Sequence, residues 1–300
     1  MTRARLWALQ HRFAPYLFVA PFVILFLCFM IYPLARSIVL SMYKTAGPNH
    51  LRFVGISNYL FLLKDRLFYI AVGNTFYFTI VMLLLQIPLA LGLAMLLNSK
   101  RIFGRSLFRF AFFSPHLVGQ VFVAIIFTLL MAQRHGLVNR MTGALLPFVG
   151  SEIDWLGRPE LAMPTIVMAA LWLSVGYGMV YFLAALQSVD IELYEAAEVD
   201  GAGKWRRFWR VTVPGIRPVL VFMVLVGTIG SLQLFELPYV LFQGSGPNYS
   251  ALTIVIYLFQ TGFETGDIGY ASAVGWALVV VIGVVAMIEF VVVRFLEDSR

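Results

Sequence analysis

The sequence has little charge, one cysteine and few histidines. Only 12% of its 300 residues are charged and 61% are hydrophobic, whereas soluble proteins contain about 25% charged and about 45–50% apolar residues. This composition argues against a soluble protein. No basic soluble domain carries the net charge of +7, so we expect no nucleic-acid partner. With Cys28 alone, the chain cannot form an intramolecular disulfide.

Catalytic and metal-binding motifs are also missing. The four histidines have no metal-ligand spacing with one another or with Cys28. There is no HExxH, no GxSxG and no complete nucleotide-binding P-loop. We therefore expect no catalytic residues, no metal site and no cofactor in this chain. If the chain takes part in an energised process such as transport, the energy must come from an ion gradient or from another subunit.

Long apolar runs are abundant instead. Crossing a hydrocarbon layer of about 30 Å requires about 20 apolar residues in a helix. Six runs qualify: Tyr16–Leu34, Ile70–Leu97, Phe112–Met131, Met163–Leu186, Pro218–Leu241 and Ala273–Val293. Because they lack the alternation of a β-barrel, they are expected to be helices. The predicted fold is all-α, a multi-pass membrane protein with six transmembrane helices.

The distribution of Lys and Arg predicts the orientation. With the N-terminus in the cytoplasm, the inside segments contain fourteen of these residues and the outside loops contain eight. The excess favours a cytoplasmic N-terminus and C-terminus. We predict a cytoplasmic segment 1–15, one membrane domain 16–295 with a cytoplasmic loop 190–218, and a tail 296–300. The first apolar run is too long for a signal peptide and is expected to be retained.

Few ionisable groups fall inside the apolar runs. Glu236 lies in the fifth run, Glu289 lies near the cytoplasmic end of the sixth, and His116 lies near the start of the third. Ion-coupled carriers place such groups within their helices. The small number favours an external energy source, with a stand-alone carrier that uses Glu236 as the alternative. In the loop 132–162, Trp155 is either an interfacial anchor or a contact for a soluble partner.

The interval Glu195–Pro218 is a charged segment between two apolar runs. Asp190 suits the N-cap of a helix over Ile191–Asp200, and Gly201 suits the position after its end. Ala196 and Ala197 form a small-residue face beside a row of glutamates. The sequence therefore predicts a short, exposed, rigid helix.

The second half of the interval mixes cations with aromatic residues, from Lys204 to Arg210. This pattern is typical of a helix at the headgroup level, and Pro214 and Pro218 stiffen the entry to the next span. An interfacial helix explains the basic half. It does not explain the acidic half, which an anionic membrane surface repels. A soluble cytoplasmic docking partner is the preferred interpretation.

These residues resemble a known family. The run Glu195-Ala196-Ala197, then Asp200-Gly201-Ala202, Phe208, Val211, Pro214 and Pro218, is similar to the EAA loop of permease subunits of bacterial ABC importers. The branch it resembles imports sugars and related polyols, alongside the maltose and glycerol-3-phosphate permeases. Further similarity lies at Tyr32-Pro33, Asp154-Trp155-Leu156 and Gly269-Tyr270-Ala271.

The resemblance implies a bacterial inner-membrane importer subunit, without enzymatic activity of its own. It implies two ATP-binding subunits that hold ATP and Mg, a second permease subunit that is expected to be a different chain, and an extracytoplasmic solute-binding protein. ATP-driven closure of the ATPases would be transmitted through the loop. The implied coupling residues are Glu195, Ala196, Ala197, Asp200, Gly201 and Ala202, with Gly201 as the hinge.

Candidates for the substrate pathway lie in the fourth and fifth spans, where aromatic faces and polar groups suit a sugar. They are Trp172, Ser174, Tyr177, Thr228, Gln233, Phe235 and Glu236. For each of them, helix packing or interfacial anchoring is an open alternative. The sequence departs from the family at Asp190, where a proline is frequent, and at Ser245, where a glycine is usual. It does not identify the solute.

Overall fold

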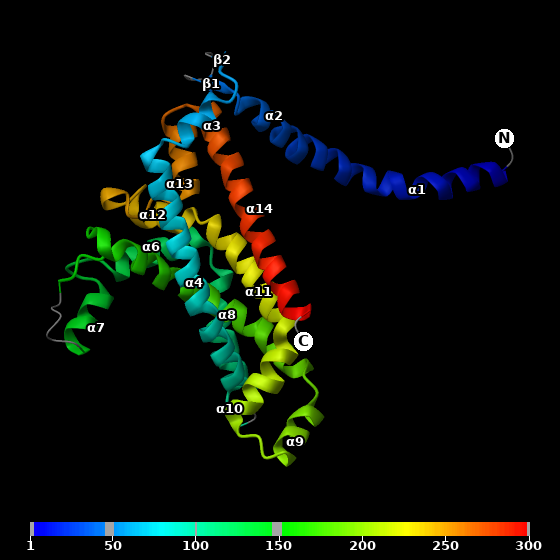
Figure 1. The fold of residues 1–300 in the computed structure, drawn as a ribbon, viewed down its shortest axis with the longest axis vertical. Helices are drawn as coiled ribbons and strands as arrows, with labels where there is room; N and C mark the ends of the chain where they lie inside the picture. Colours follow the sequence, from blue (N-terminus) through cyan, green and yellow to red (C-terminus); the bar gives the residue numbers. More distant parts are fainter. Residues whose placement is uncertain (1–2, 46–50, 100, 146–151, 299–300) are drawn as a thin grey trace. The chain divides into compact units, whose positions relative to one another are not determined.

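A computed structural model describes residues 3–45, 51–99, 101–145 and 152–298. Five helical runs are long and apolar enough to cross a membrane. The first passes through α1 (Arg3–Phe26), the π-helical turn η1 (Leu27–Ile31) and α2 (Tyr32–Leu40). The others are α4 (Arg66–Asn98), α8 (Pro159–Ser188), the run α10–η4–α11 (Lys204–Leu232) and α14 (Ile268–Asp298). The all-α fold predicted from the sequence is confirmed (Figure 1).

A sixth span consists of two helical pieces bent by 102°. The first piece is α5 (Arg105–Phe113) with the 3₁₀ turn η2 (Ser114–Leu117), and the second is α6 (Gln120–Leu130). The sequence predicted one unbroken helix over Phe112–Met131, and this is wrong. Pro115 has no backbone N–H to continue the helix, and Gly119 adopts an extended conformation before α6. The count of six holds with the bent pair taken as one span.

The fifth predicted span is also interrupted. α11 (Val213–Leu232) ends within the predicted Pro218–Leu241 helix, and α12 (Glu236–Phe242) begins after three residues. The freed carbonyl of Leu234 accepts a buried 2.8 Å hydrogen bond from the Thr253 hydroxyl. Because an unpaired carbonyl is costly within a membrane, this bond stabilises the break. Apolar periodicity alone could not reveal a partner from another segment.

The chain divides into two units. The smaller comprises residues 1–64 and 258–277, and it contains a hairpin of β1 (Tyr43–Thr45) and β2 (Leu51–Phe53), in which Lys44 pairs with Arg52. In α3 (Ser57–Leu62), the Asn58 amide donates to the carbonyls of Ser41 and Tyr43, both at 2.8 Å. The all-α prediction did not include this hairpin.

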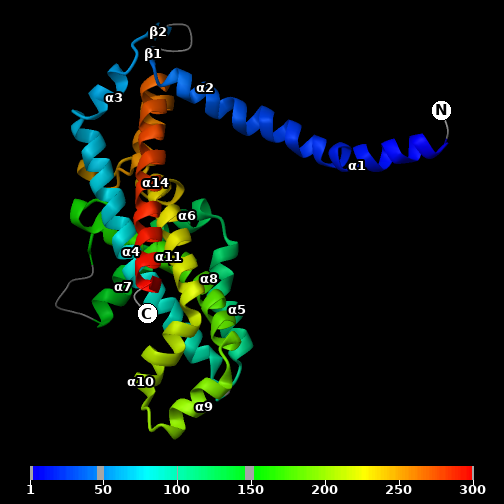
Figure 2. The same cartoon turned by 45° about the vertical axis from the view of Figure 1, so that its right-hand side comes forward.

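The larger unit comprises residues 65–257 and 278–300. It also contains α7 (Leu137–Leu145), α9 (Ile191–Val199) and the turn η5 (Pro247–Tyr249). The helix α13 (Ile254–Phe259) crosses the boundary between the units, and η6 (Gln260–Glu264) lies in the smaller one. In both views α4, α8 and α11 run side by side, and α9 and α10 lie beyond their ends (Figures 1 and 2).

The packing of α4 against α8 and α11 relies on small side chains. Ala90 and Ala94 of α4 are fully buried, and Gly178 of α8 approaches Ala90 so closely that an added Cβ would lie 2.9 Å from the Ala90 Cβ. Small residues let helix backbones approach one another in a membrane, where apolar side chains gain nothing from leaving lipid. The bundle of the larger unit therefore depends on close packing.

Trp155 is half-buried and fixed to the larger unit, and its two predicted roles, interfacial anchor and contact for a soluble partner, stay predictions. Its ring packs on the core of the larger unit, and its Nε1 donates a 2.8 Å hydrogen bond to Oδ1 of Asn139. The amide of Asn139 donates to the carbonyls of Gln133 and Ile153, both at 2.8 Å. Asn139 is 1% exposed, so the described part of the 132–162 loop is fixed by a buried amide.

Candidate functional site

The charged loop forms a short capped helix as the sequence predicts. Oδ1 of Asp190 accepts a 3.0 Å hydrogen bond from the backbone N–H of Glu192 and caps α9. Gly201 follows the helix with φ of +72°, a region that glycine enters without steric cost. The N–H of Ala202 donates to the carbonyl of Ala197 at 2.9 Å and closes the turn. Local sequence determines both ends of α9.

The chain then returns directly into the membrane span. α10 (Lys204–Arg207) continues without a break through the π-helical turn η4 (Phe208–Thr212) into α11. Pro214 and Pro218 lie in the first turns of α11, where their rings fix φ and so stiffen the helical run at its entry to the membrane span. One continuous helical run therefore extends from the charged loop to the middle of the larger unit.

Two contacts join α9 to the returning chain. Nη1 of Arg207 lies 2.7 Å from Oε2 of Glu198, and the Tyr194 hydroxyl lies 3.0 Å from Oγ1 of the buried Thr212. They connect residues on both sides of the turn at Gly201. Together with the closed turn, they make α9, α10 and η4 one braced hairpin, which we call the loop hairpin (residues 190–212). A force on α9 would reach α11 with little slack.

The six coupling residues implied by the family resemblance lie on this hairpin. Glu195, Ala196, Asp200 and Gly201 are exposed, and Ala197 and Ala202 are half-buried. Val199 at the end of α9 is 89% exposed. An uncovered helix with small, acidic and apolar residues is suited to insertion into a groove of another protein. A coupling role for these six residues stays a prediction, and their exposure is compatible with it.

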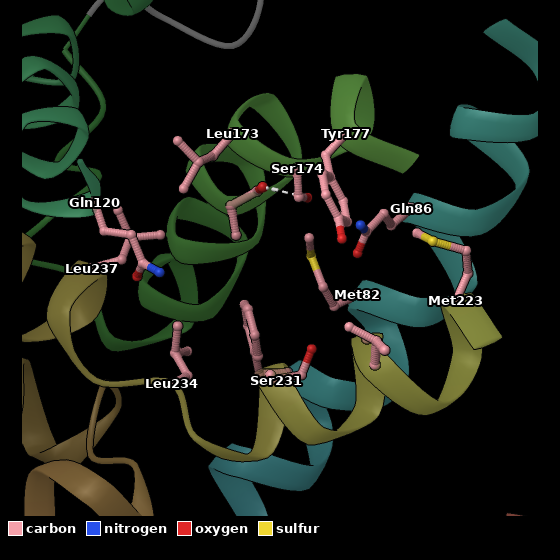
Figure 3. A pocket seen from close by; sticks show the side chains of 15 residues that line it. Met82, Gln86, Gln120, Leu173, Ser174, Tyr177, Met223, Ser231, Leu234 and Leu237 are labelled. Carbon is pink, nitrogen blue, oxygen red and sulfur yellow. Dashed lines mark hydrogen bonds between the residues drawn. The ribbon is translucent and has the colours of Figure 1, made fainter. Parts of the chain in front are cut away.

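A cavity of about 210 Å³ lies deeper in the larger unit, between α4, α6, α8, α11 and α12. Its wall is formed by Phe78, Met82, Gln86, Gln120, Ala170, Leu173, Ser174, Tyr177, Met223, Val226, Gly227, Gly230, Ser231, Leu234 and Leu237. In Figure 3 the Tyr177 side chain extends from α8 toward the side of the cavity where Gln86 projects from α4. The break after α11 places Leu234 and Leu237 on the opposite wall.

The cavity is apolar with a few uncharged polar groups. Amides come from Gln86 and Gln120, and hydroxyls come from Ser174, Tyr177 and Ser231. No charged side chain belongs to its wall. The rings continue beyond it, because His116 stacks on Tyr177 at a centroid distance of 4.5 Å and Tyr181 lies 4.7 Å from Tyr177. Aromatic faces and neutral hydrogen-bonding groups together suit a neutral polyhydroxylated molecule.

Two of the seven predicted pathway residues, Ser174 and Tyr177, line this cavity. Trp172 is 45% exposed and packs on Phe127, with centroids 5.8 Å apart. Thr228 is 2% exposed and donates to Glu289.

The remaining three predicted residues lie at the break between α11 and α12. Gln233 and Glu236 are exposed, and the ring of Phe235 stacks on Tyr239. The cavity wall contains none of these three, nor Trp172 or Thr228. A role for these five in the pathway stays a prediction.

Sequence reasoning missed Gln86, Gln120, Ser231 and the neighbouring His116 as parts of this site. For Gln86 the sequence contains a signal, because it is a polar residue within the long apolar run Ile70–Leu97. In the structure its side-chain amide is buried, with 9% of the residue exposed. Polar residues within spans are costly and usually functional. Gln86 and Gln120 are not ionisable and lie outside the fourth and fifth spans, so neither criterion applied to the sequence selects them. Among the described residues, no group of three or more His, Cys, Asp or Glu could hold a metal ion.

Comparison with known proteins relates the chain to one family. Residues 86–299 match the family model described as binding-protein-dependent transport system inner membrane component. The chain is 39% identical to the arabinooligosaccharides transport system permease protein AraP of Bacillus subtilis, over 92% of this chain and 87% of that protein. It is 37% identical to the lactose transport system permease protein LacF of Rhizobium radiobacter, over 93% of each.

Solved structures agree with this similarity. A chain of a bacterial ABC transporter involved in the import of the acidic polysaccharide alginate superposes with a TM-score of 0.81 and 26% identity. The superposition covers 97% of this chain and 98% of that chain. A second structure of an alginate transporter, in complex with a periplasmic protein bound to an alginate pentasaccharide, gives the same TM-score.

Proposed function

The chain belongs to the family of binding-protein-dependent transport system inner membrane components, and we propose that it is the permease subunit of an importer for neutral sugars. It is a multi-pass inner-membrane protein and a transport component of an ABC importer. The observation that carries the sugar assignment is the cavity, whose wall combines aromatic, amide and hydroxyl groups and contains no charged side chain.

Neutral sugars are favoured over acidic ones by the same wall. A carboxylate or phosphate within a membrane protein requires a cation or several directed N–H donors. The cavity offers only two side-chain amides and three hydroxyls. These groups match sugar hydroxyls, and Tyr177 offers a ring face near the stacked His116. Relatives named for arabinooligosaccharides and lactose support this class of solute.

Energy enters at the loop hairpin in this proposal. Two ATP-binding subunits hold ATP and Mg, and one of them receives α9 in a surface groove. The exposed residues Glu195, Ala196, Asp200 and Gly201 form the contact, with Ala197 and Ala202 supporting them. The braced hairpin passes the motion into α11, whose residues Met223, Gly227 and Ser231 also form the cavity wall. ATP hydrolysis and solute exposure are coupled along this one helix.

A second permease subunit, which we propose is a different chain, completes the pathway, and an extracytoplasmic binding protein delivers the solute. A complex with a periplasmic binding protein in a structural neighbour supports the latter. The alternative of a stand-alone carrier that uses Glu236 is not retained, because the family is a component of binding-protein-dependent systems.

Uptake by the reconstituted importer tests the proposal. The chain would be assembled in vesicles with the ATP-binding subunits, the second permease and the binding protein of its importer, and ATP-dependent uptake of labelled lactose, arabinotriose, an alginate trisaccharide and glycerol 3-phosphate would be compared. We expect uptake of a neutral sugar only. Gln86→Leu should reduce it at least about tenfold by removing a buried amide contact, whereas Gln187→Leu, an exposed position on the same helix as Tyr177, should not. Uptake of the acidic solutes alone would overturn the proposal.

A further inference from the structure

The returning half of the loop hairpin has an uncovered basic and aromatic surface. The rings of Trp205, Phe208 and Trp209 form a cluster with centroid distances of 5.1 to 5.8 Å. Trp205 is 73% exposed and Trp209 is 53% exposed. Around them, the cations Lys204, Arg206 and Arg210 are exposed. These five exposed residues (Lys204, Trp205, Arg206, Trp209 and Arg210) are called the basic–aromatic face below.

This face lies next to the membrane along the chain. Trp209 precedes Val213, the first residue of α11, by four residues and Pro218, where the charge-free part of α11 begins, by nine, which is about 6 Å and about 14 Å along a helix that rises 1.5 Å per residue. A headgroup layer is about 5–8 Å thick on each side of the hydrocarbon. Between Pro218 and Leu232 there is no charged residue. Trp209 therefore lies close to the membrane–water boundary along the chain, a region where tryptophan is enriched.

The charges of the loop hairpin are separated along it. Glu192, Glu195 and Asp200 lie exposed on or just after α9, whereas the exposed cations lie on α10 and η4. Arg207 is paired with Glu198 and is not available to a further anion. An anionic membrane surface attracts each basic residue and repels acidic ones. Such a surface would draw α10 and η4 toward the bilayer and direct α9 away from it.

We propose that the basic–aromatic face binds anionic phospholipid headgroups of the bilayer and so fixes the orientation in which α9 is presented. A soluble protein is a weaker candidate for this face, because the face continues directly into a membrane span and carries two exposed tryptophans. Lys204, Arg206 and Arg210 contact the lipid phosphates, and the exposed rings of Trp205 and Trp209 contact the headgroup layer. This proposal does not depend on the identity of the solute or on the energy source.

Lipid-specific quenching of tryptophan fluorescence tests it. The full-length chain would be placed in nanodiscs of phosphatidylcholine with increasing phosphatidylglycerol, with either lipid brominated in turn. Bromine quenches tryptophans that it contacts. We expect brominated phosphatidylglycerol to quench more than brominated phosphatidylcholine at equal mole fraction. This excess should disappear in the Trp205→Phe/Trp209→Phe variant, which assigns it to the basic–aromatic face rather than to the other tryptophans.

A charge-matched pair of variants separates binding from general attraction. In Lys204→Gln/Arg206→Gln/Arg210→Gln, the affinity for phosphatidylglycerol should fall about fivefold for each charge removed, so that half-maximal quenching is no longer reached at any phosphatidylglycerol fraction that is reached by the wild type. The control Arg134→Gln/Arg140→Gln/Arg158→Gln removes the same charge from exposed positions elsewhere and should leave it unchanged. Equal quenching by the two lipids in the wild type, or an equal shift in both variants, would overturn the proposal. If the Trp205→Phe/Trp209→Phe variant is quenched by each lipid as much as the wild type, the face does not contact lipid, and the proposal would also be overturned.

Discussion

Thr228 donates a 2.6 Å hydrogen bond to Oε1 of Glu289 and so joins α11 to the second half of α14. The other carboxylate oxygen, Oε2, is buried and has no hydrogen-bond partner among the described residues. Thr228→Val keeps the side-chain shape but leaves both oxygens without this donor. We expect a loss of about 1–3 kcal/mol in the free energy of unfolding, measured by thermal unfolding in nanodiscs.

The matched control is Thr128→Val. The Thr128 hydroxyl bonds to the Ala124 carbonyl of its own helix at 2.9 Å, so its loss leaves no buried charged group unpaired. The double variant Thr228→Val/Glu289→Leu should be more stable than Thr228→Val alone, because it removes the orphaned carboxyl. If Thr228→Val unfolds at the temperature of the wild type, Glu289 has another partner and the assignment fails.

Gly176→Ala should be the most damaging small substitution in α8. A Cβ at this position would lie 1.7 Å from the Phe112 carbonyl oxygen and 2.4 Å from its carbonyl carbon. The obstacle is backbone, so α8 and α5 would have to separate. Since Tyr177 follows directly and lines the cavity, the separation should also reduce uptake. We expect at least about 3 kcal/mol of destabilisation, the upper part of the range for overpacking.

Gly92→Ala in α4 is the control for this substitution. An added Cβ at Gly92 meets no atom within 4 Å, and alanine restricts the unfolded chain more than glycine does. The protein should therefore become more stable by about 0.4–1 kcal/mol. Similar unfolding temperatures for Gly176→Ala and Gly92→Ala would show that α8 does not approach α5 as closely as the structure indicates.

The features predicted well from the sequence depend on local or compositional rules. The carboxylate of Asp190 suits the start of a short helix, and Gly201, which has no side chain, suits the left-handed conformation after its end. The structure places both residues there. The apolar runs follow from the length needed to cross a bilayer. The orientation of the termini stays a prediction, since no membrane is present to define the two sides.

The features missed depend on contacts between distant segments. The break after Leu232 is stabilised by Thr253, and Thr228 faces Glu289 rather than the cavity. Helical periodicity shows which residues share a face, but it does not show which neighbour covers that face. Gln86 and Gln120 converge on one cavity from α4 and α6 only because the third span bends. Such convergence requires the tertiary arrangement.

Asn139→Ala should loosen the loop that Trp155 anchors. The substitution leaves the Trp155 N–H and the carbonyls of Gln133 and Ile153 without their partner. A buried polar group left unpaired costs about 1–3 kcal/mol. We expect faster limited proteolysis within the loop 132–162 than in the wild type. Gln133→Ala, which retains the backbone carbonyl at an exposed position, should be cleaved at the wild-type rate, and faster cleavage there would contradict this account.

The Glu198–Arg207 ion pair should affect coupling more than stability. Glu198 is 71% exposed in its side chain, and exposed pairs contribute about 0.2–1 kcal/mol to folding. However, this pair connects α9 to the chain that returns into α11. Glu198→Arg and Arg207→Glu place like charges at the contact and should separate the two halves of the loop hairpin. In the reconstituted importer, we expect each to lower the number of solute molecules transported per ATP hydrolysed.

The double swap Glu198→Arg/Arg207→Glu distinguishes the pair from its individual charges. It restores an ion pair of opposite polarity and should recover most of the transport per ATP, while the unfolding temperature stays within a few degrees of the wild type in all three variants. Glu192→Arg is the control, because it changes the charge of the same helix at a residue without an ion pair among the described residues. Adding Arg207→Glu to Glu192→Arg should therefore not restore transport per ATP. If the double swap transports no better than either single variant, the pair does not brace the hairpin, and the turn at Gly201 with the Tyr194–Thr212 contact carries that role alone.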